Sequence, residues 1–194
     1  GGFNRVRSIA QGSGDSLWIG AVEHGLMKFD PASGRFLKTP FVRAANVMKD
    51  RSGKIWITTE GDGLDIYDPV AGTTNHLYND PSRPNSLSRN ITWTTYEDPS
   101  GRIWVGAGTV INLWNPAAGS FTCYPNPLFN DASGAYPVGS DKMGRLWVCY
   151  ARRGLSILNP SSGEFTSYDA SEGVCGFVYD MESMEDGRVL LAGS

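Results

Sequence analysis

Histidine and cysteine are scarce in this sequence. Among 194 residues there are two histidines, His24 and His76, and three cysteines, Cys123, Cys149 and Cys175. Two isolated histidines cannot build a histidine-based metal cluster, and cysteines that stand 26 residues apart fit no metal or redox signature. We therefore expect free, buried thiols and no metal or other cofactor.

The sequence also lacks a charge excess and a long apolar run. Seventeen Lys and Arg against 20 Asp and Glu give a formal net charge of −3, with the basic residues scattered from Arg5 to Arg188. Scattered bases argue against a nucleic-acid groove. No run of 18 apolar residues occurs, so this segment is not expected to contact a membrane itself. With 40% hydrophobic residues, the chain is expected to form one globular unit.

Glycine and proline are abundant, with 24 and 11 of the 194 residues. Together they make up about 18% of the chain, whereas their ordinary combined share is roughly 12%. Frequent turns argue against helical bundles. A tryptophan recurs in short aliphatic segments, and its separations are 38, 48 and 43 residues: Trp18, Trp56, Trp104 and Trp147. Another 43 residues on, Leu190 takes the same place. A repeat of about 40 residues is typical of propellers and other repeat folds.

Each repeat predicts four strands. An Asp-x-x-Gly turn precedes the tryptophan in three copies, at residues 50–53, 98–101 and 141–144, and the first copy has Gly-Ser-Gly-Asp instead. A Gly-Leu strand with alternating polarity follows in three copies, and Asp/Asn-Pro-x-x-Gly follows in all four. Proline and glycine at these positions specify a hairpin. Four antiparallel strands in 40-odd residues form a propeller blade.

We therefore predict an all-β fold, a β-propeller with four complete four-stranded blades and a half blade. Blades stack face to face because each has two apolar faces, and the tryptophans are expected to pack between them. Residues 1–194 would form one partial propeller domain with blades at about 3–40, 41–79, 88–125 and 133–169 and a half blade at 174–194. We expect a fragment of a larger ring, whose open strand edge favours oligomerisation or closure by the first blade.

The repeat resembles the two-component regulator propeller repeat, as found in the periplasmic sensor region of Bacteroidetes hybrid two-component histidine kinases. The resemblance covers essentially the whole chain. The segment Tyr78–Asn90 is similar to the Asp-Pro-x-x-Pro-x-Ser-Leu-Ser insertion of these sensors. Repeat three departs from the pattern because Gly108-Thr109 replaces Gly-Leu. The resemblance implies a periplasmic part of an inner-membrane protein that recognises a ligand, an oligosaccharide or another small extracellular molecule, and signals to a kinase as a homo-oligomer.

Binding residues are expected on the blade face where strand two connects to strand three and where each blade connects to the next, because variable loops on a rigid scaffold carry binding. Aromatic rings suit the C–H faces of sugars, and charged groups suit hydroxyls. The candidates are Trp93, Tyr136, Tyr150, Arg89, Arg152, Arg153, Glu60, Asp62 and His24. For each charged residue the alternative is a solvated loop position.

Two other functions stay open. Glu23, Glu60 and Asp62 would be candidate carboxylates for glycoside cleavage, and propeller lyases similar to streptogramin lyase carry related repeats. No nucleophile triad, phosphate-binding loop or metal spacing supports catalysis, and residues 62–65 lack the spacing of a calcium loop. We therefore expect a binding module rather than an enzyme. A pure protein-interaction scaffold is the remaining alternative.

Overall fold

A computed structural model describes residues 6–21, 23–130, 134–174, 177–184, 186 and 188–193. The chain divides into two compact units, residues 1–95 (unit one) and 96–194 (unit two), which are described separately. In every described sheet, strands that follow one another in the sequence are hydrogen-bonded neighbours, as in the antiparallel order β1-β2-β3-β4.

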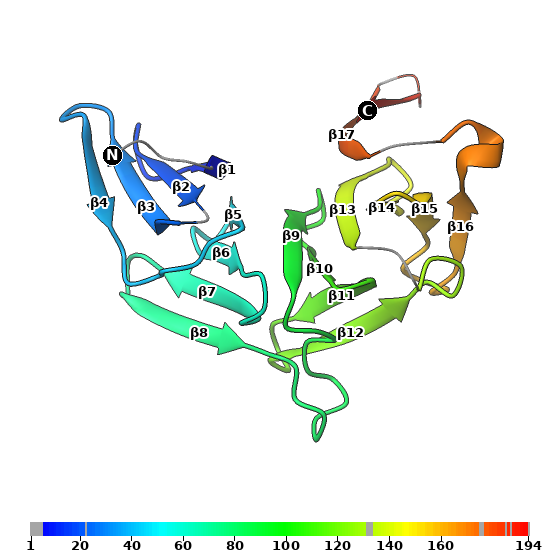
Figure 1. The fold of residues 1–194 in the computed structure, drawn as a ribbon, viewed down its shortest axis with the longest axis horizontal. Helices are drawn as coiled ribbons and strands as arrows, with labels where there is room; N and C mark the ends of the chain where they lie inside the picture. Colours follow the sequence, from blue (N-terminus) through cyan, green and yellow to red (C-terminus); the bar gives the residue numbers. More distant parts are fainter. Residues whose placement is uncertain are drawn as a thin grey trace. The chain divides into compact units, whose positions relative to one another are not determined.

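Unit one contains two complete four-stranded sheets (Figure 1). Sheet one consists of β1 (Val6–Gln11), β2 (Leu17–Ala21), β3 (Gly25–Asp30) and β4 (Arg35–Lys38). Sheet two consists of β5 (Asn46–Lys49), β6 (Ile55–Thr58), β7 (Leu64–Asp68) and β8 (Thr73–Leu77).

Unit two contains most of sheet three, then sheet four and a final strand pair. Sheet three consists of β9 (Thr92–Glu97), which begins at the end of unit one, β10 (Ile103–Ala107), β11 (Val110–Asn115) and β12 (Ser120–Pro125). Sheet four consists of β13 (Ala135–Ser140), β14 (Leu146–Tyr150), β15 (Gly154–Leu158) and β16 (Phe165–Tyr168). A short 3-10 turn, η1 (Ala170–Glu172), precedes the paired strands β17 (Val178–Ser183) and β18 (Val189–Gly193). The predicted all-β fold is confirmed.

Two of the repeat tryptophans, Trp18 and Trp104, pack within apolar layers between sheets, as predicted. Trp18 belongs to a buried cluster that joins Leu26 of sheet one to Val47 and Ile57 of sheet two, where β1 lies beside β5. Trp104 of sheet three is fully buried with Leu146 and other residues of sheet four.

The Asp-x-x-Gly turn does more than reverse the chain, because its aspartate also binds the tryptophan. In the turn before β10, the Oδ1 atom of Asp98 accepts hydrogen bonds from the backbone amides of Ser100 and Arg102. Its Oδ2 atom accepts a hydrogen bond from the indole N–H of Trp104. The same indole bond recurs in three sheets: Trp56 to Asp50 at 2.8 Å, Trp104 to Asp98 at 3.0 Å and Trp147 to Asp141 at 3.2 Å. One carboxylate therefore ties the turn to the layer between sheets.

This hydrogen bonding makes the stability of unit two sensitive to acid. Burial acts to raise the pKa of Asp98, but hydrogen bonds from Trp104 and from the backbone and guanidinium of Arg102 outweigh it and leave the pKa below its ordinary value. A group whose pKa is lowered by folding stabilises the fold above about pH 4, and this contribution is lost as the pH falls through the lowered value.

Asp98→Asn is expected to lower the free energy of unfolding at pH 7 by about 1–3 kcal/mol, because charge-assisted bonds are replaced by neutral ones. The loss is expected to be smaller at pH 3, below the ordinary Asp pKa of about 3.9, because the unfolded carboxyl is then largely protonated and the stabilisation by the lowered pKa of Asp98 declines. Denaturant unfolding at both pH values measures this difference. Asp15→Asn, at an exposed turn, serves as the control, and equal losses for Asp98→Asn at pH 7 and pH 3 would contradict the assignment.

The glycine of the Gly-Leu strand is required by a close approach of the backbone. Gly25 and Gly63 have φ angles of +68° and +91°, which side-chain-bearing residues rarely adopt. A Cβ atom on Gly25 would lie 1.8 Å from the carbonyl oxygen of Phe41, and one on Gly63 would lie 2.3 Å from that of Leu77. Glycine therefore lets the chain leaving a sheet pass directly over the start of its third strand.

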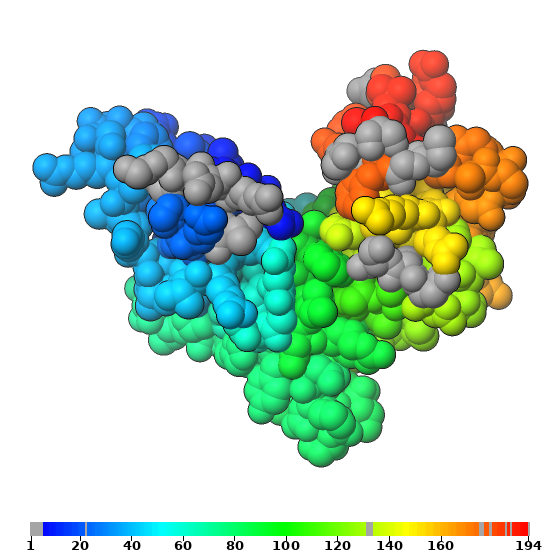
Figure 2. Space-filling model, viewed as in Figure 1, coloured from blue at the N-terminus to red at the C-terminus, as the bar shows by residue number. Residues whose placement is uncertain are grey.

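The insertion between β8 and β9 is a structured segment anchored by one buried leucine. Asp80 starts a turn in which Arg83 donates a backbone hydrogen bond to the Asp80 carbonyl, and the Ser86 hydroxyl accepts from the Asp80 amide. Leu87 is fully buried, whereas the turn itself projects as the green knob at the lower edge of Figure 2.

Cys149 is a buried free thiol, and the half-buried Cys123 thiol donates to the Asn112 amide oxygen at 3.3 Å. Burial raises the pKa of each thiol. Cys175, predicted as a third free thiol, lies outside the described residues. Within the described part of the chain, no three His, Cys, Asp or Glu side chains gather as a metal site. In that same part no helix has the length and apolar character needed to cross a membrane.

Candidate functional site

The connections between second and third strands meet the connections between sheets, as predicted. In unit one the Leu26 amide donates to the Phe41 carbonyl at 3.0 Å, and the Gly63 amide donates to the Asn90 carbonyl at 2.8 Å. In unit two the Ala151 amide donates to the Gly134 carbonyl at 3.1 Å. Within each unit these connections form one loop face.

In unit one the loop between β6 and β7 is held rigidly by two buried threonines. The Thr59 hydroxyl accepts from the Asp62 amide at 2.9 Å, and the Thr92 hydroxyl accepts from the Thr59 amide at 2.8 Å and lies 2.7 Å from the Gly63 carbonyl. Glu60 also forms an isolated antiparallel bridge with Ile91. The side chains of Glu60 and Asp62 are therefore presented from a well-supported backbone.

Two arginines from separate parts of the chain face these carboxylates. The Arg7 Nη2 atom lies 2.9 Å from Glu60 Oε1, and the Arg43 Nη1 atom lies 3.1 Å from Asp62 Oδ2. Both members of the first pair are 43% exposed, and both members of the second are 60% exposed. Exposed pairs of this kind contribute about 0–1 kcal/mol, so they are free to exchange partners with a ligand at little cost.

A cavity of about 220 Å³ lies between these pairs and is lined by Arg43, Ala44, Ala45 and Glu60. Ala44 is 2% exposed and Ala45 9%, so the two methyl groups form an apolar floor. Charged walls above an apolar floor resemble the common make-up of small-molecule sites.

The alanine at this place in the repeat is what leaves the room. Eleven residues before the repeat tryptophan, the four repeats carry Arg7, Ala45, Trp93 and Tyr136. A β-bulge lies beside this position in β1 and in β13, and bulges re-aim side chains. Only in sheet two is the residue small, and there the cavity opens beside Glu60.

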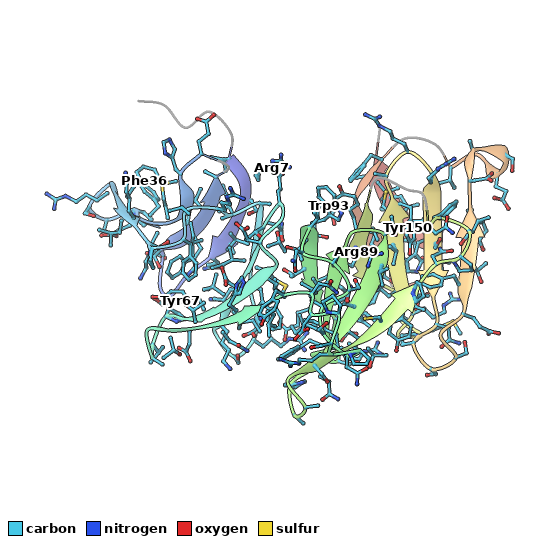
Figure 3. The ribbon with its side chains drawn as sticks, turned by 60° about the horizontal axis from the view of Figure 1, so that its bottom comes forward. Arg7, Phe36, Tyr67, Arg89, Trp93 and Tyr150 are labelled. Carbon is cyan, nitrogen blue, oxygen red and sulfur yellow. The ribbon has the colours of Figure 1, made fainter. Side chains whose placement is uncertain are left out.

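The other predicted residues of unit one are Trp93, Arg89 and His24. Trp93 is half-buried on β9, and its carbonyl accepts from the Thr58 hydroxyl at 3.1 Å. Arg89 is exposed and donates to the Ser88 carbonyl. Figure 3 labels Arg7, Arg89 and Trp93. His24 is exposed in the loop between β2 and β3 and does not line the cavity.

The predicted residues of unit two are Tyr136, Tyr150, Arg152 and Arg153. Tyr136 is half-buried and packs edge-on against Phe177, with 4.8 Å between ring centroids. Arg152, with φ of +63°, and Arg153 are exposed in the loop between β14 and β15. The predicted residues are thus divided between the two units. In unit one Glu60 lines the cavity, and Asp62 pairs with Arg43, which also lines it.

Tyr150 differs from the expectation of a ligand-facing ring. It is fully buried in the layer between sheets three and four, with Phe129 5.2 Å away between ring centroids. Asn126 lies beside the buried Tyr150 hydroxyl, and the side-chain amide of Asn126 donates to Ser156. Burial raises the pKa of Tyr150 above its ordinary value. In this structure the ring is a packing residue.

Arg7 and Arg43 were missed because neither stands in a repeated motif. Their partners are 53 and 19 residues away in the sequence, and charge alone does not select them among 17 basic residues. The only signal was positional: Arg7 precedes the repeat tryptophan by the same eleven residues as Trp93.

Comparison with known protein families matches one segment of the chain. Residues 86–109 match the family model of the two component regulator propeller. No protein of curated function matches the chain significantly.

Three solved structures with a similar fold are informative. The extracellular domain of a putative hybrid two component system from B. thetaiotaomicron has a TM-score of 0.79 and 22% identity, over 100% of this chain and 28% of that domain. A second such domain from the same organism has a TM-score of 0.75 and 18% identity, over 97% and 26%. Virginiamycin B lyase from Staphylococcus aureus has a TM-score of 0.71 and 15% identity, over 98% and 64%.

These similarities define the class of protein: the fold is a β-propeller, as predicted. The chain resembles, in its residues 86–109, the two component regulator propeller, as expected. It spans about a quarter of the length of the two sensor domains that it resembles.

Proposed function

We propose that this chain is part of the ligand-sensing propeller of a hybrid two-component signalling protein, and that it binds an oligosaccharide without transforming it. Its repeat family and its fold, shared with extracellular domains of putative hybrid two component systems, support a sensor role. The same similarity supports a periplasmic position, as the sensor part of an inner-membrane protein.

The loop-face cavity of unit one is the observation that carries the binding proposal. It combines an apolar floor at Ala44 and Ala45 with charged walls at Arg43 and Glu60, held on a loop that buried hydroxyls stabilise. Sites of this kind bind with little reorganisation, which favours affinity.

The signalling step in this proposal is a shift between two states of a homo-oligomer. A ligand can move such an equilibrium only by its differential affinity for the two states. The rigid loop around Glu60 and Asp62 gives the ligand a defined contact, and the kinase on the other side of the membrane would respond to the favoured state.

The expected result of a thermal unfolding screen is stabilisation by a subset of oligosaccharides of two to six rings. A ligand at 100 times its dissociation constant stabilises by about 2.7 kcal/mol, which raises the melting temperature of a chain of this size by about 5–10 °C. The same screen with Glu60→Gln is expected to lose the shift, and Glu164→Gln, at an exposed turn of sheet four, serves as its control.

Absence of any stabilising oligosaccharide would contradict the binding proposal and favour a protein-interaction scaffold. Hydrolysis is not expected in this screen. A glycoside hydrolase needs two carboxyl groups that face the scissile bond, whereas Glu60 and Asp62 each face an arginine. Turnover abolished by Glu60→Gln would instead establish an enzyme.

A further inference from the structure

We propose that the unit-one cavity holds one neutral sugar ring and selects against acidic and basic sugars. The proposal rests on the proposed function, because it specifies the chemistry of the oligosaccharide that this site accepts. Its basis is the arrangement of charge, the apolar floor and the size of the cavity.

The charges on the described residues of the cavity wall cancel. Arg43 and Glu60 both line the cavity, and each is compensated from outside the wall by a different partner, Asp62 and Arg7. A ligand carboxylate would gain from Arg43 but would be repelled by Glu60, and an ammonium group would meet the reverse. Neither charged ligand therefore has a net electrostatic advantage to offset the loss of its hydration.

A neutral polyhydroxyl ring suits both walls at once. Each hydroxyl donates one hydrogen bond and accepts others, so one ring can accept from the guanidinium of Arg43 and donate to the carboxylate of Glu60. Hydrogen bonds to charged groups are stronger than neutral ones. The ring also has C–H groups, which can pack on the methyl groups of Ala44 and Ala45.

The volume limits the ligand to a small group. Sites for drug-sized ligands measure about 300–1,000 Å³, and the cavity measures about 220 Å³. This is the scale of a single ring with its hydroxyls. A longer glycan would place one ring in the cavity and its other rings outside.

The test compares neutral methyl glycosides with their charged counterparts on the full 194-residue chain. The probes are the methyl glycosides of glucose, galactose, mannose, xylose and fucose, with methyl glucuronide, methyl galacturonide and methyl glucosaminide, measured by ligand-detected NMR titration. At least one neutral glycoside is expected to bind at about millimolar strength, as expected for so few atoms. The acidic and basic glycosides are expected to bind at least 10-fold more weakly.

Variants of the two walls are expected to change selectivity in opposite directions. Arg43→Gln removes the positive charge of the cavity wall and the arginine that faces Asp62, so the affinity for the amino sugar is expected to rise at least 5-fold relative to that for the neutral sugar. Glu60→Gln removes the negative charge of the wall and leaves Arg7 and Arg43 in place. The affinity for the uronides relative to the neutral sugar is therefore expected to rise by a similar factor. Lys38→Gln, on the exposed strand β4, removes one charge outside the site and is expected to change neither ratio. A merely structural role of Arg43 or Glu60 would not move the ratios in opposite directions.

Ala45→Leu tests the location by filling the cavity and is expected to weaken neutral-sugar binding at least 10-fold, with folding verified by circular dichroism. The inference is overturned if the uronides or the amino sugar bind better to the wild type, if no neutral glycoside binds, or if folded Ala45→Leu binds oligosaccharides unchanged. Oligosaccharide binding in any of these cases leaves the proposed function standing. No binding of any oligosaccharide overturns the proposed function itself.

Discussion

Trp104→Ala is expected to lower the free energy of unfolding of unit two by about 3–5 kcal/mol, the usual cost of truncating a buried aromatic residue. Trp104 is 0% exposed and belongs to the cluster between sheets three and four. Its indole donates to Asp98, and Arg102 lies 5.3 Å over its ring. Truncation therefore leaves a cavity. It also deprives the buried Asp98 carboxylate of a hydrogen-bond donor, which adds to the loss of stability.

Denaturant unfolding followed by circular dichroism measures this loss. Trp147→Ala is the matched control, because Trp147 has the same place in the next repeat and the same bond to its turn aspartate but is only half-buried. Its loss is expected to be clearly smaller. Equal losses at the two positions would show that burial between sheets is not what the tryptophan contributes.

Gly63→Ala is expected to lower the free energy of unfolding of unit one by about 2–4 kcal/mol. Two costs add: a side chain at φ of +91° is strained, by about 1–2 kcal/mol, and the Cβ atom would lie 2.3 Å from the Leu77 carbonyl oxygen. The chain leaving β8 must then shift, and with it the bond between the Gly63 amide and the Asn90 carbonyl.

Gly72→Ala isolates the first of these costs. Gly72 has φ of +67°, and a Cβ atom there would meet nothing within 4 Å, so only the backbone strain of about 1 kcal/mol is expected. Urea titrations of both variants measure the difference. If Gly63→Ala costs no more than Gly72→Ala, the close approach of the backbone is not what requires glycine.

The strand architecture was predictable because it depends on local signals. Gly63 and its counterpart Gly25 mark the start of a third strand, and proline-glycine turns such as the one at Pro69 mark the next hairpin. These preferences act over a few residues, and four repetitions of the same order strengthen each one.

The residues of the candidate site were only partly predictable. Glu60 and Asp62 stand in a variable loop and were expected on the binding face, but nothing in the sequence paired them with Arg7 and Arg43. Tyr150 stands in an equally suitable loop position but is covered, with Phe129 packed against its ring.

The sequence by itself determined the repeat, its four strands and the tryptophan layer, since turn residues, strand alternation and large aromatic residues act locally or at a constant spacing. The tertiary structure alone decided which carboxylate meets which arginine, where Ala45 leaves a cavity and that the turn aspartates bind the indoles. Such contacts join residues that are brought together only when sheets stack and their loops cross. Their geometry depends on packing in three dimensions and has no counterpart in a local pattern.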